Sequence, residues 1–296
     1  MKGGIYMRAQ LQKLIENRVQ QYVSQHRTTC PKINTKKDMF AKRSAEVVKA
    51  IAVGKINQTC IKNQLNEVLY TVHYQYLIEQ KGFLYLEEEI EERSATFAEG
   101  KLVEDEEVPP TFYPVESPNG GGEELAHREQ FERTTFTYNR LKAIQYAEQW
   151  WNSYNPRYKK FENDCTNFIS QCLHQGGAPM RGYPSRSKGW WMVENNWSYS
   201  WSVANSFRIY LASSKIGLRT REVTSPDQLL FGDVICYDFE GDGRYNHNTI
   251  VTGKDAFGMP LVNAHTTNSR LRYWSYEDST AYTPNIKYKF FSIVDG

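Results

Sequence analysis

The chain has 296 residues, of which 40% are hydrophobic and 24% are charged, and its mean hydropathy is −0.66. The 36 basic and 34 acidic residues leave a net charge of +2, which argues against a surface built for nucleic acid or anionic lipid. No apolar run is long enough to span a bilayer, and the polar start lacks the apolar core of a signal peptide. We expect two domains with buried cores and, for the chain as written, a cytoplasmic location.

The first hundred residues predict a small α+β domain. Apolar residues recur with helical spacing over residues 9–25 and again over 38–53. Between residues 68 and 76 they alternate with polar residues, which is typical of a half-buried strand. The acidic run 87–92 follows in a second alternating stretch, and we expect this run on a solvated strand face.

A segment rich in proline and glycine then separates two parts of the chain. Residues 108–122 read VPPTFYPVESPNGGG, a composition typical of a linker. We predict an N-terminal domain over 1–107, a linker and connecting segment over 108–137, and a second α+β domain over 138–296. No motif in the first domain indicates a reaction.

The second part is organised around Cys165, at the opening of a predicted helix. Asp164 or Asn163 is placed to act as the N-cap, which puts the cysteine in the first turn. The free N–H groups of that turn and the helix dipole stabilise a thiolate, so we expect the pKa of this thiol to be lowered. Apolar residues of the helix share one face; they are Phe168, Ile169, Cys172 and Leu173.

The cysteines form neither the pattern of a metal site nor that of a disulfide framework. The five of them include no CxxC pair and no zinc-ligand spacing, and their odd, sparse count is typical of reduced thiols. They are Cys30, Cys60, Cys165, Cys172 and Cys236. The sequence predicts no metal, and each thiol has to be considered singly.

Three β-type stretches follow the cysteine helix, at 232–237, 248–251 and 261–266. His247 begins the second stretch, and Asn263 and His265 lie two apart on the third, so both should face one side of the sheet. If a hairpin over 255–258 joins these strands, that side can also carry His247. A thiol, an imidazole base and a group that orients the base are the parts needed for thiol acyl transfer.

Structural roles account for each of these residues when it is taken alone. A cysteine on an apolar helix face is usually packing, His247 could be a turn residue, and His265 could be a hydrogen-bonded core histidine. The loop over 189–201 holds four tryptophans, which could seal the core or line a ligand groove.

Several motifs of the second part resemble the putative amidase domain found in Gram-positive bacteria, a branch near the papain-like NlpC/P60 and CHAP groups. In chain order they are 138–140 (YNR), 164–171 (DCTNFISQ), 176–177 (GG), 200–202 (SWS), 232–235 (GDVI), 242–243 (DG) before His247, and 265–266 (HT). The resemblance implies a papain-like α+β fold with the nucleophile helix packed on an antiparallel sheet. It implies Cys165 as the nucleophile and His247 as the base, and leaves the third member open between Asn263 and His265. Asn248 departs from the pattern, because relatives commonly have an apolar residue after this histidine.

The resemblance therefore implies a cysteine amidase or peptidase that hydrolyses an amide bond through a thioester, without a cofactor. The substrate class it implies is a peptide or a cell-wall fragment. We expect the substrate to contact Asp164, Trp190, Trp191 and Trp201. Two alternatives are an inactive glycan- or peptide-binding module and an acyltransferase, since the thioester can also pass its acyl group to an amine.

Overall fold

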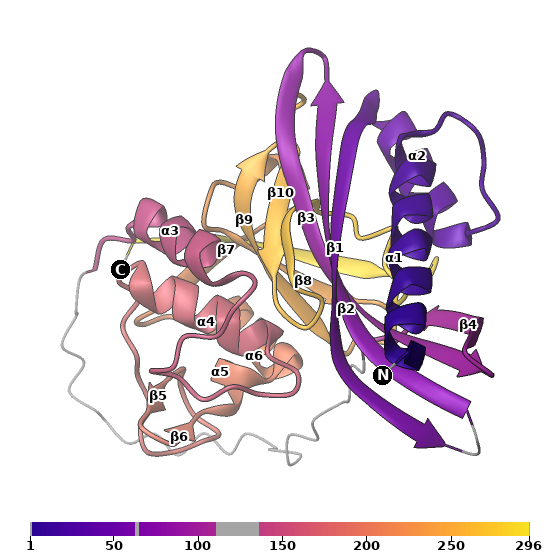
Figure 1. Ribbon diagram of the computed structural model, residues 1–296. Coiled ribbons are helices and arrows are strands. Elements are labelled where there is room, and N and C mark those ends of the chain that lie inside the picture. The colour runs from indigo at the N-terminus through magenta and orange to yellow at the C-terminus, as the bar shows by residue number, and fades with distance from the viewer. Residues whose placement is uncertain (1, 63–64, 111–135, 296) are drawn as a thin grey trace. The chain divides into compact units, whose positions relative to one another are not determined.

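A computed structural model describes residues 2–62, 65–110 and 136–295 (Figure 1). The chain forms two compact units, the first combining the residues up to Pro110 with residues 267–282. The described part of the second unit covers 136–266 and 283–295. Our contiguous division placed 267–282 in the second domain, whereas this segment packs in the first unit. Most of the predicted linker, 111–135, lies outside the described residues, so its extent stays a prediction.

Two helices and five antiparallel strands build the first unit. Its elements are α1 (Lys2–Val23), α2 (Pro31–Lys42), β1 (Ala45–Lys62), β2 (Leu65–Gln80), β3 (Phe83–Ala98), β4 (Lys101–Glu107) and β11 (Ser269–Tyr273). The strand β2 lies between β1 and β3, and β3 pairs with β11 near its start and with β4 near its end. Both helices contact β1 and so cover one face of this sheet (Figure 1).

The strand pattern of β2 was predicted correctly, whereas the helix over 38–53 was wrong. Every second residue of β2 from Val68 to Gln80 is buried, as its alternation indicates. In the predicted second helix, however, α2 ends at Lys42 and β1 begins at Ala45. The β-branched residues Val47, Val48 and Ile51 favour a strand, and full-length pairing with β2 outweighs the helical spacing.

Four of the five glutamates in the run 87–92 are buried, contrary to our expectation of a solvated face, and only Glu92 of this run is exposed. Glu87, Glu89 and Glu91 of β3 are 0%, 1% and 2% exposed. Lysines of α2 reach these carboxylates, with Lys36 Nζ 2.5 Å from Glu87 and Lys32 Nζ 2.5 Å from Glu91. The run can be buried because the helices supply opposite charges at hydrogen-bond distance.

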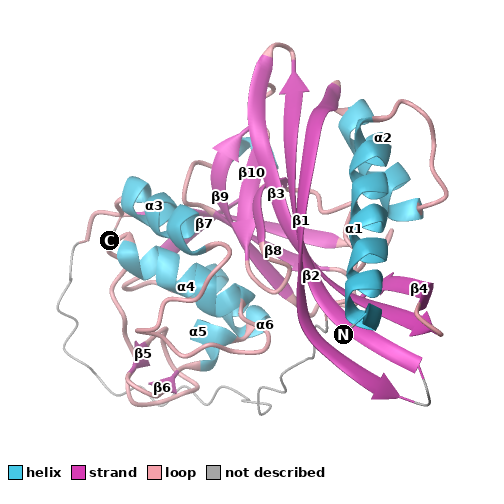
Figure 2. Cartoon of the chain, viewed as in Figure 1, coloured by secondary structure: helices cyan, strands magenta, loops and turns pink. Residues whose placement is uncertain are grey.

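The second unit places helices against antiparallel strands that follow one another in the sheet (Figure 2). Its helices are α3 (Arg140–Trp150), α4 (Cys165–Gln175), α5 (Tyr199–Ser202) and α6 (Ala204–Ser213), with a short 3-10 turn at Pro226–Gln228. Its sheet has the order β10 (Pro260–Ala264), β9 (His247–Lys254), β8 (Val234–Asp238), β12 (Lys287–Val294) and β7 (Arg219–Val223). A separate small hairpin joins β5 (Met192–Val193) to β6 (Asn196–Trp197).

The elements that hold the candidate site agree with the sequence pattern. α4 begins at Cys165, and β8, β9 and β10 overlap the three predicted β stretches. A turn over residues 255–258 joins β9 to β10, and the Asp255 carboxylate accepts the N–H groups of Phe257 and Met259. The helices α3 and α4 contact each other and β9. The coarse prediction of helices packed on antiparallel strands is therefore confirmed.

Candidate active site

Cys165 lies at the covered start of α4. All residues from Cys165 to Leu173 are buried, and Cys165 itself is 3% exposed. An amphipathic surface helix would leave one face in solvent, whereas the first nine of the eleven residues of α4 are covered on every side. The thiol is therefore enclosed in the unit, and its reactivity depends on the groups around the sulfur.

Asp164 holds the N-cap position, but its side chain has other partners. Its Oδ1 accepts hydrogen bonds from the Phe161 N–H and from the Asn167 side-chain amide, both at 2.9 Å. Its Oδ2 lies 2.8 Å from Nδ1 of His265. Because Asp164 is 1% exposed and fully engaged, it organises the loop before α4 and does not form the expected substrate contact.

Thr266 caps α4 in place of Asp164. Its Oγ1 accepts the N–H groups of Asp164 and Cys165, each at 3.1 Å. Its φ angle is +76°, a conformation that is rare for a β-branched residue. Sequence reasoning noted Thr266 only as part of a short motif, since neither the cap nor the backbone angle leaves a local signal.

Hydrogen-bond donors surround the Cys165 sulfur. The Thr166 hydroxyl lies 3.7 Å from Sγ, and the Thr266 hydroxyl and the main-chain N–H groups of Thr166 and Asn248 also bond to it. Burial raises the pKa of the Cys165 thiol, and these hydrogen bonds offset only part of that effect. The expected low pKa is therefore wrong for this closed arrangement, because desolvation outweighs the helix terminus.

His247 begins β9 and is fully buried. It pairs with Tyr237 of β8, and its ring centroid lies 5.6 Å from that of Tyr237 and 6.0 Å from that of Phe239. The next residue, Asn248, donates a side-chain hydrogen bond of 2.8 Å to Thr166 Oγ1 on α4. Because successive strand residues face opposite sides, the imidazole leaves β9 on the face away from α4. The structure thus brings the main chain after His247 to the sulfur and directs the ring toward the aromatic residues.

Asn263 faces the helices. It pairs with Ile250 of β9, three positions from His247, so the side chains of Asn263 and His247 lie on opposite faces of the sheet. Its Oδ1 accepts a hydrogen bond from Thr252, and its amide donates one to Glu148 of α3, at 2.7 and 2.8 Å. The expected shared face with His247 is wrong, because the register of β10 places Asn263 opposite an even-numbered residue of β9.

His265 is held by both ring nitrogens just beyond β10. Nδ1 lies 2.8 Å from Asp164 and Nε2 lies 2.8 Å from the carbonyl oxygen of Trp150, while the ring stacks on Phe168 at 4.0 Å. A cavity of about 10 Å³ beside Asp164 and His265 has room for a single water at most. Neither ring nitrogen is left to orient His247, so His265 instead fixes the chain next to Thr266.

The three tryptophans expected in a substrate groove belong to the core. Trp190, Trp191 and Trp201 are all 0% exposed, and the rings of Trp190 and Trp201 lie 4.8 Å apart. The Trp190 and Trp201 ring N–H groups donate to Ser170 and Asn167 of α4, at 2.9 and 2.8 Å. The groove role is therefore corrected, because these side chains pack beneath α4 and satisfy their polar atoms internally.

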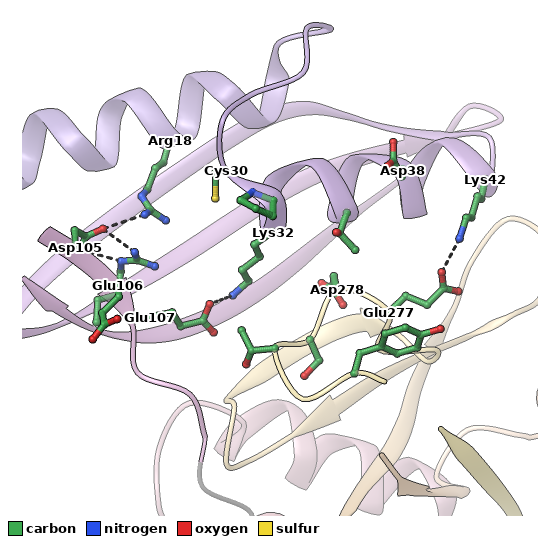
Figure 3. A pocket seen from close by; sticks show the side chains of 16 residues that line it. Arg18, Cys30, Lys32, Asp38, Lys42, Asp105, Glu106, Glu107, Glu277 and Asp278 are labelled. Carbon is green, nitrogen blue, oxygen red and sulfur yellow. Dashed lines mark hydrogen bonds and ion pairs between the residues drawn. The ribbon is translucent and has the colours of Figure 1, made fainter. Parts of the chain in front are cut away.

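A larger cavity lies within the first unit. It has a volume of about 780 Å³ and lies between α2, the end of β4 and the segment 277–282 (Figure 3). Its basic side chains are paired with acids, for example Arg18 with Asp105 at 2.9 Å and Lys42 with Glu277 at 2.8 Å. We call it the charged cleft. Its size suits a ligand, but its four basic side chains are all paired, and six acidic side chains leave the lining with an excess of negative charge.

The described ranges hold neither a cluster of side chains that fits a metal ion nor a helix that fits a membrane. Among residues 2–62, 65–110 and 136–295, no three His, Cys, Asp or Glu side chains are arranged to hold a metal ion. In the same part of the chain, none of the helices combines the length and apolarity that crossing a membrane requires.

Comparison with known proteins places the chain in a family. Residues 137–291 match the family described as putative amidase domain. The chain is 50% identical over 307 aligned positions to the protein named uncharacterized protein YhbB of Bacillus subtilis (strain 168), covering all of this chain and 98% of the relative. It is 30% identical over 140 positions to uncharacterized protein YjcM of the same organism, covering 44% of this chain and 31% of that protein.

The search of solved structures returns no significant match, so the family rests on sequence alone. The matched residues contain Cys165, Thr266 and all the strands of the second unit except the last residues of β12. With just over half of the chain matched, the protein belongs to the putative amidase domain family.

Proposed function

We propose that the protein is a cysteine-dependent hydrolase that cleaves an amide bond through a thioester on Cys165. The proposal is carried by one observation: the sulfur at the first turn of α4 is surrounded by hydrogen-bond donors and not by apolar packing alone. Donors at that position stabilise the thiolate that attacks the carbonyl carbon. The family membership supplies the reaction class. We further propose a papain-like arrangement, with α4 against β9 and β10.

His247 is the proposed base. Its imidazole takes the thiol proton as sulfur attacks the amide carbon, and it returns this proton to the leaving amine when the carbon–nitrogen bond breaks. Water then cleaves the thioester and releases the acid and the free thiol. The ring leaves β9 on the face away from α4, so the reaction requires the main chain at the start of β9 to rearrange until the imidazole reaches the sulfur. The main chain of Asn248 already bonds to the sulfur, which puts the start of that side chain one residue away.

Peptides of the cell wall are the substrate class that we propose to test first. This choice rests on the resemblance of the motifs around Cys165 to peptidoglycan-directed groups, and on no feature of a groove. The alternative of a binding module that holds its ligand with tryptophans is disfavoured, because Trp190, Trp191 and Trp201 are buried. Acyl transfer to an amine shares the thioester and is separated from hydrolysis by its product.

The test compares two cysteines of one helix. Purified full-length protein is incubated with peptidoglycan, with and without an added amine acceptor, and released amino groups and acyl products are measured. Cys165→Ala should abolish product formation, and His247→Ala should reduce it by at least about a hundredfold. Cys172→Ala, which alters a fully buried thiol further along α4, should leave the rate close to wild type. Equal activity of the Cys165→Ala and wild-type proteins would refute the proposal.

A further inference from the structure

The hydroxyl of Thr266 has a complete and directional set of hydrogen bonds. A hydroxyl offers two acceptor lone pairs and one hydrogen. Both lone pairs of Thr266 Oγ1 are taken by the N–H groups of Asp164 and Cys165, at 3.1 Å each. Its hydrogen is then left for the sulfur of Cys165, whose own N–H the oxygen already binds, and a hydrogen bond from this hydroxyl lowers the pKa of the thiol. Two donors pulling on the oxygen also polarise its O–H bond, which strengthens the bond to a thiolate.

The surroundings hold Thr266 in a conformation that it would not adopt alone. A β-branched residue at φ +76° costs on the order of 1–3 kcal/mol and persists only where its neighbours fix it. His265 provides this fixation, because its two nitrogens bond to Asp164 and to the Trp150 carbonyl and its ring stacks on Phe168. Residues 164–165 and 265–266 are thus joined by three hydrogen bonds, an arrangement we call the clasp.

We propose that Thr266 is the positioning residue of the Cys165 nucleophile: the clasp aims its hydroxyl at the sulfur, where it holds the thiolate ready for attack. This inference rests on the proposed role of Cys165. A cap that served α4 alone could be any acceptor with relaxed backbone geometry, such as the side chain of an ordinary N-cap residue. The strained backbone at Thr266 places the hydroxyl between the helix terminus and the sulfur at once, which a local cap does not need.

Several other titratable groups face the sulfur, and the test leaves them in place. Asp164 precedes Cys165, His265 precedes Thr266, and the main chain at His247 adjoins the sulfur through Asn248. On β8, Cys236 is a further buried thiol, and burial raises its pKa. A change of the thiol titration in a Thr266 variant therefore reports the hydroxyl, provided that the fold is retained.

The experiment measures how fast iodoacetamide labels Cys165 between pH 6 and pH 10, with the site of labelling located by mass spectrometry. Thr266→Val keeps the shape that covers the sulfur and removes the hydroxyl, whereas Thr266→Ser keeps the hydroxyl and removes a methyl group. In Thr266→Val the midpoint of the pH profile should rise by about one unit, and labelling at pH 7 should slow about tenfold. Thr266→Ser should retain the wild-type midpoint.

An unchanged midpoint in folded Thr266→Val, or a midpoint in Thr266→Ser that rises as far, would overturn the inference. If Thr266→Val does not fold, as judged by circular dichroism, Thr266→Ala provides the same comparison with a smaller side chain. The result is independent of substrate. Activity that survives in Cys165→Ala refutes the proposed function and leaves the titration result intact, so the two failures are distinguishable.

Discussion

The charged cleft and the thiol site stabilise buried polar groups by opposite means. Around the charged cleft, each buried charge meets an opposite charge, as when Lys32 Nζ lies 2.5 Å from Glu91 and 2.7 Å from Glu107. At the thiol site, the sulfur is surrounded by hydroxyl and main-chain donors that carry no formal charge. At Glu91 the charges of Lys32 and Arg93 hold the carboxylate ionised, with its pKa lowered to about 2. Neutral donors allow the thiol to gain or lose its proton, which a nucleophile requires.

The contrast between charged partners and neutral donors indicates which of the two regions can react. A carboxylate that is locked by two cations has little freedom to exchange a proton at neutral pH, so the larger cavity is the less reactive one. The smaller, covered site keeps a neutral thiol, and in the proposed reaction its donors stabilise the thiolate that forms when a base removes the proton. The following predictions test whether the first region depends on charge and the second on neutral hydrogen bonds.

The largest effect is expected for Lys36→Met in the first unit. Lys36 is 0% exposed, and its Nζ lies 2.5 Å from Glu87 and 2.9 Å from Asp278. Removing one partner leaves buried carboxylates without their cation, at a cost of about 3–5 kcal/mol in the free energy of unfolding. Hydrogen exchange of the β2 and β3 amides, followed by mass spectrometry, should show this loss in the first unit.

Lys42→Met is the matched control for that loss. Lys42 also lies on α2 and pairs with Glu277 at 2.8 Å, but its side chain is 67% exposed. An exposed pair contributes little, so exchange should stay close to wild type. Equal effects of the two variants would show that helix packing, and not the buried charge, accounts for the result.

The second prediction uses acid to remove the charge. Burial alone would raise the pKa of Glu91, but the charges of Lys32 and Arg93 and their hydrogen bonds lower it to about 2, from an ordinary value of 4.5. A lowered folded-state pKa gives stability that is present above pH 4.5 and is lost as the pH falls toward 2. We expect the advantage of wild type over Glu91→Gln to shrink in this window by roughly 3 kcal/mol in the free energy of unfolding.

Glu107→Gln should change in the opposite direction in the same acid titration. Burial raises the pKa of Glu107 despite the attraction of Lys32, so this carboxyl binds its proton more tightly in the folded state. The stability of wild type relative to Glu107→Gln should therefore grow as the pH falls. Parallel behaviour of the two variants would contradict the assignment of their charges.

The third prediction concerns the clasp in the second unit. His265→Gln removes the ring that bonds to Asp164 and Trp150 and stacks on Phe168, which should cost about 2–3 kcal/mol. Six of the seven tryptophans belong to the second unit, so tryptophan fluorescence in urea follows its unfolding. His174→Gln alters a histidine at the far end of α4, whose Nδ1 lies 3.2 Å from the Ala178 carbonyl oxygen, and it should cost less. A larger loss in His174→Gln would argue against the clasp as a stabilising feature.

The sequence predicts those parts of the fold that depend on local pattern. The alternation of β2 and the start of α4 at Cys165 follow from side-chain spacing and agree with the structure. The burial of Glu87 could not be predicted in this way, because its cation comes from α2, 51 positions earlier in the chain. Residues 267–282 belong to the first unit because β11 pairs with β3, and this tertiary contact likewise has no local signal in the sequence.

The site divides in the same way. Cys165 and the strands that follow it are visible in the motifs, but the cap that Thr266 provides joins positions 101 residues apart. The side of the sheet on which His247 and Asn263 place their side chains depends on strand register, and the hairpin prediction did not determine that register. The burial of Trp201 is decided by α4, which supplies the acceptor for its ring N–H.

The smallest expected effect separates a core residue from a substrate contact. Trp201→Phe keeps an aromatic ring beneath α4 and removes the hydrogen bond to Asn167, so the free energy of unfolding should fall by about 1–2 kcal/mol. Because that bond joins neutral groups, the loss should be the same at low and high salt, unlike a loss from an exposed ion pair. If Trp201→Phe raises KM while the free energy of unfolding is unchanged, Trp201 contacts the substrate. Unchanged KM with reduced stability is the result expected for a tryptophan that holds α4, and with it Cys165, in place.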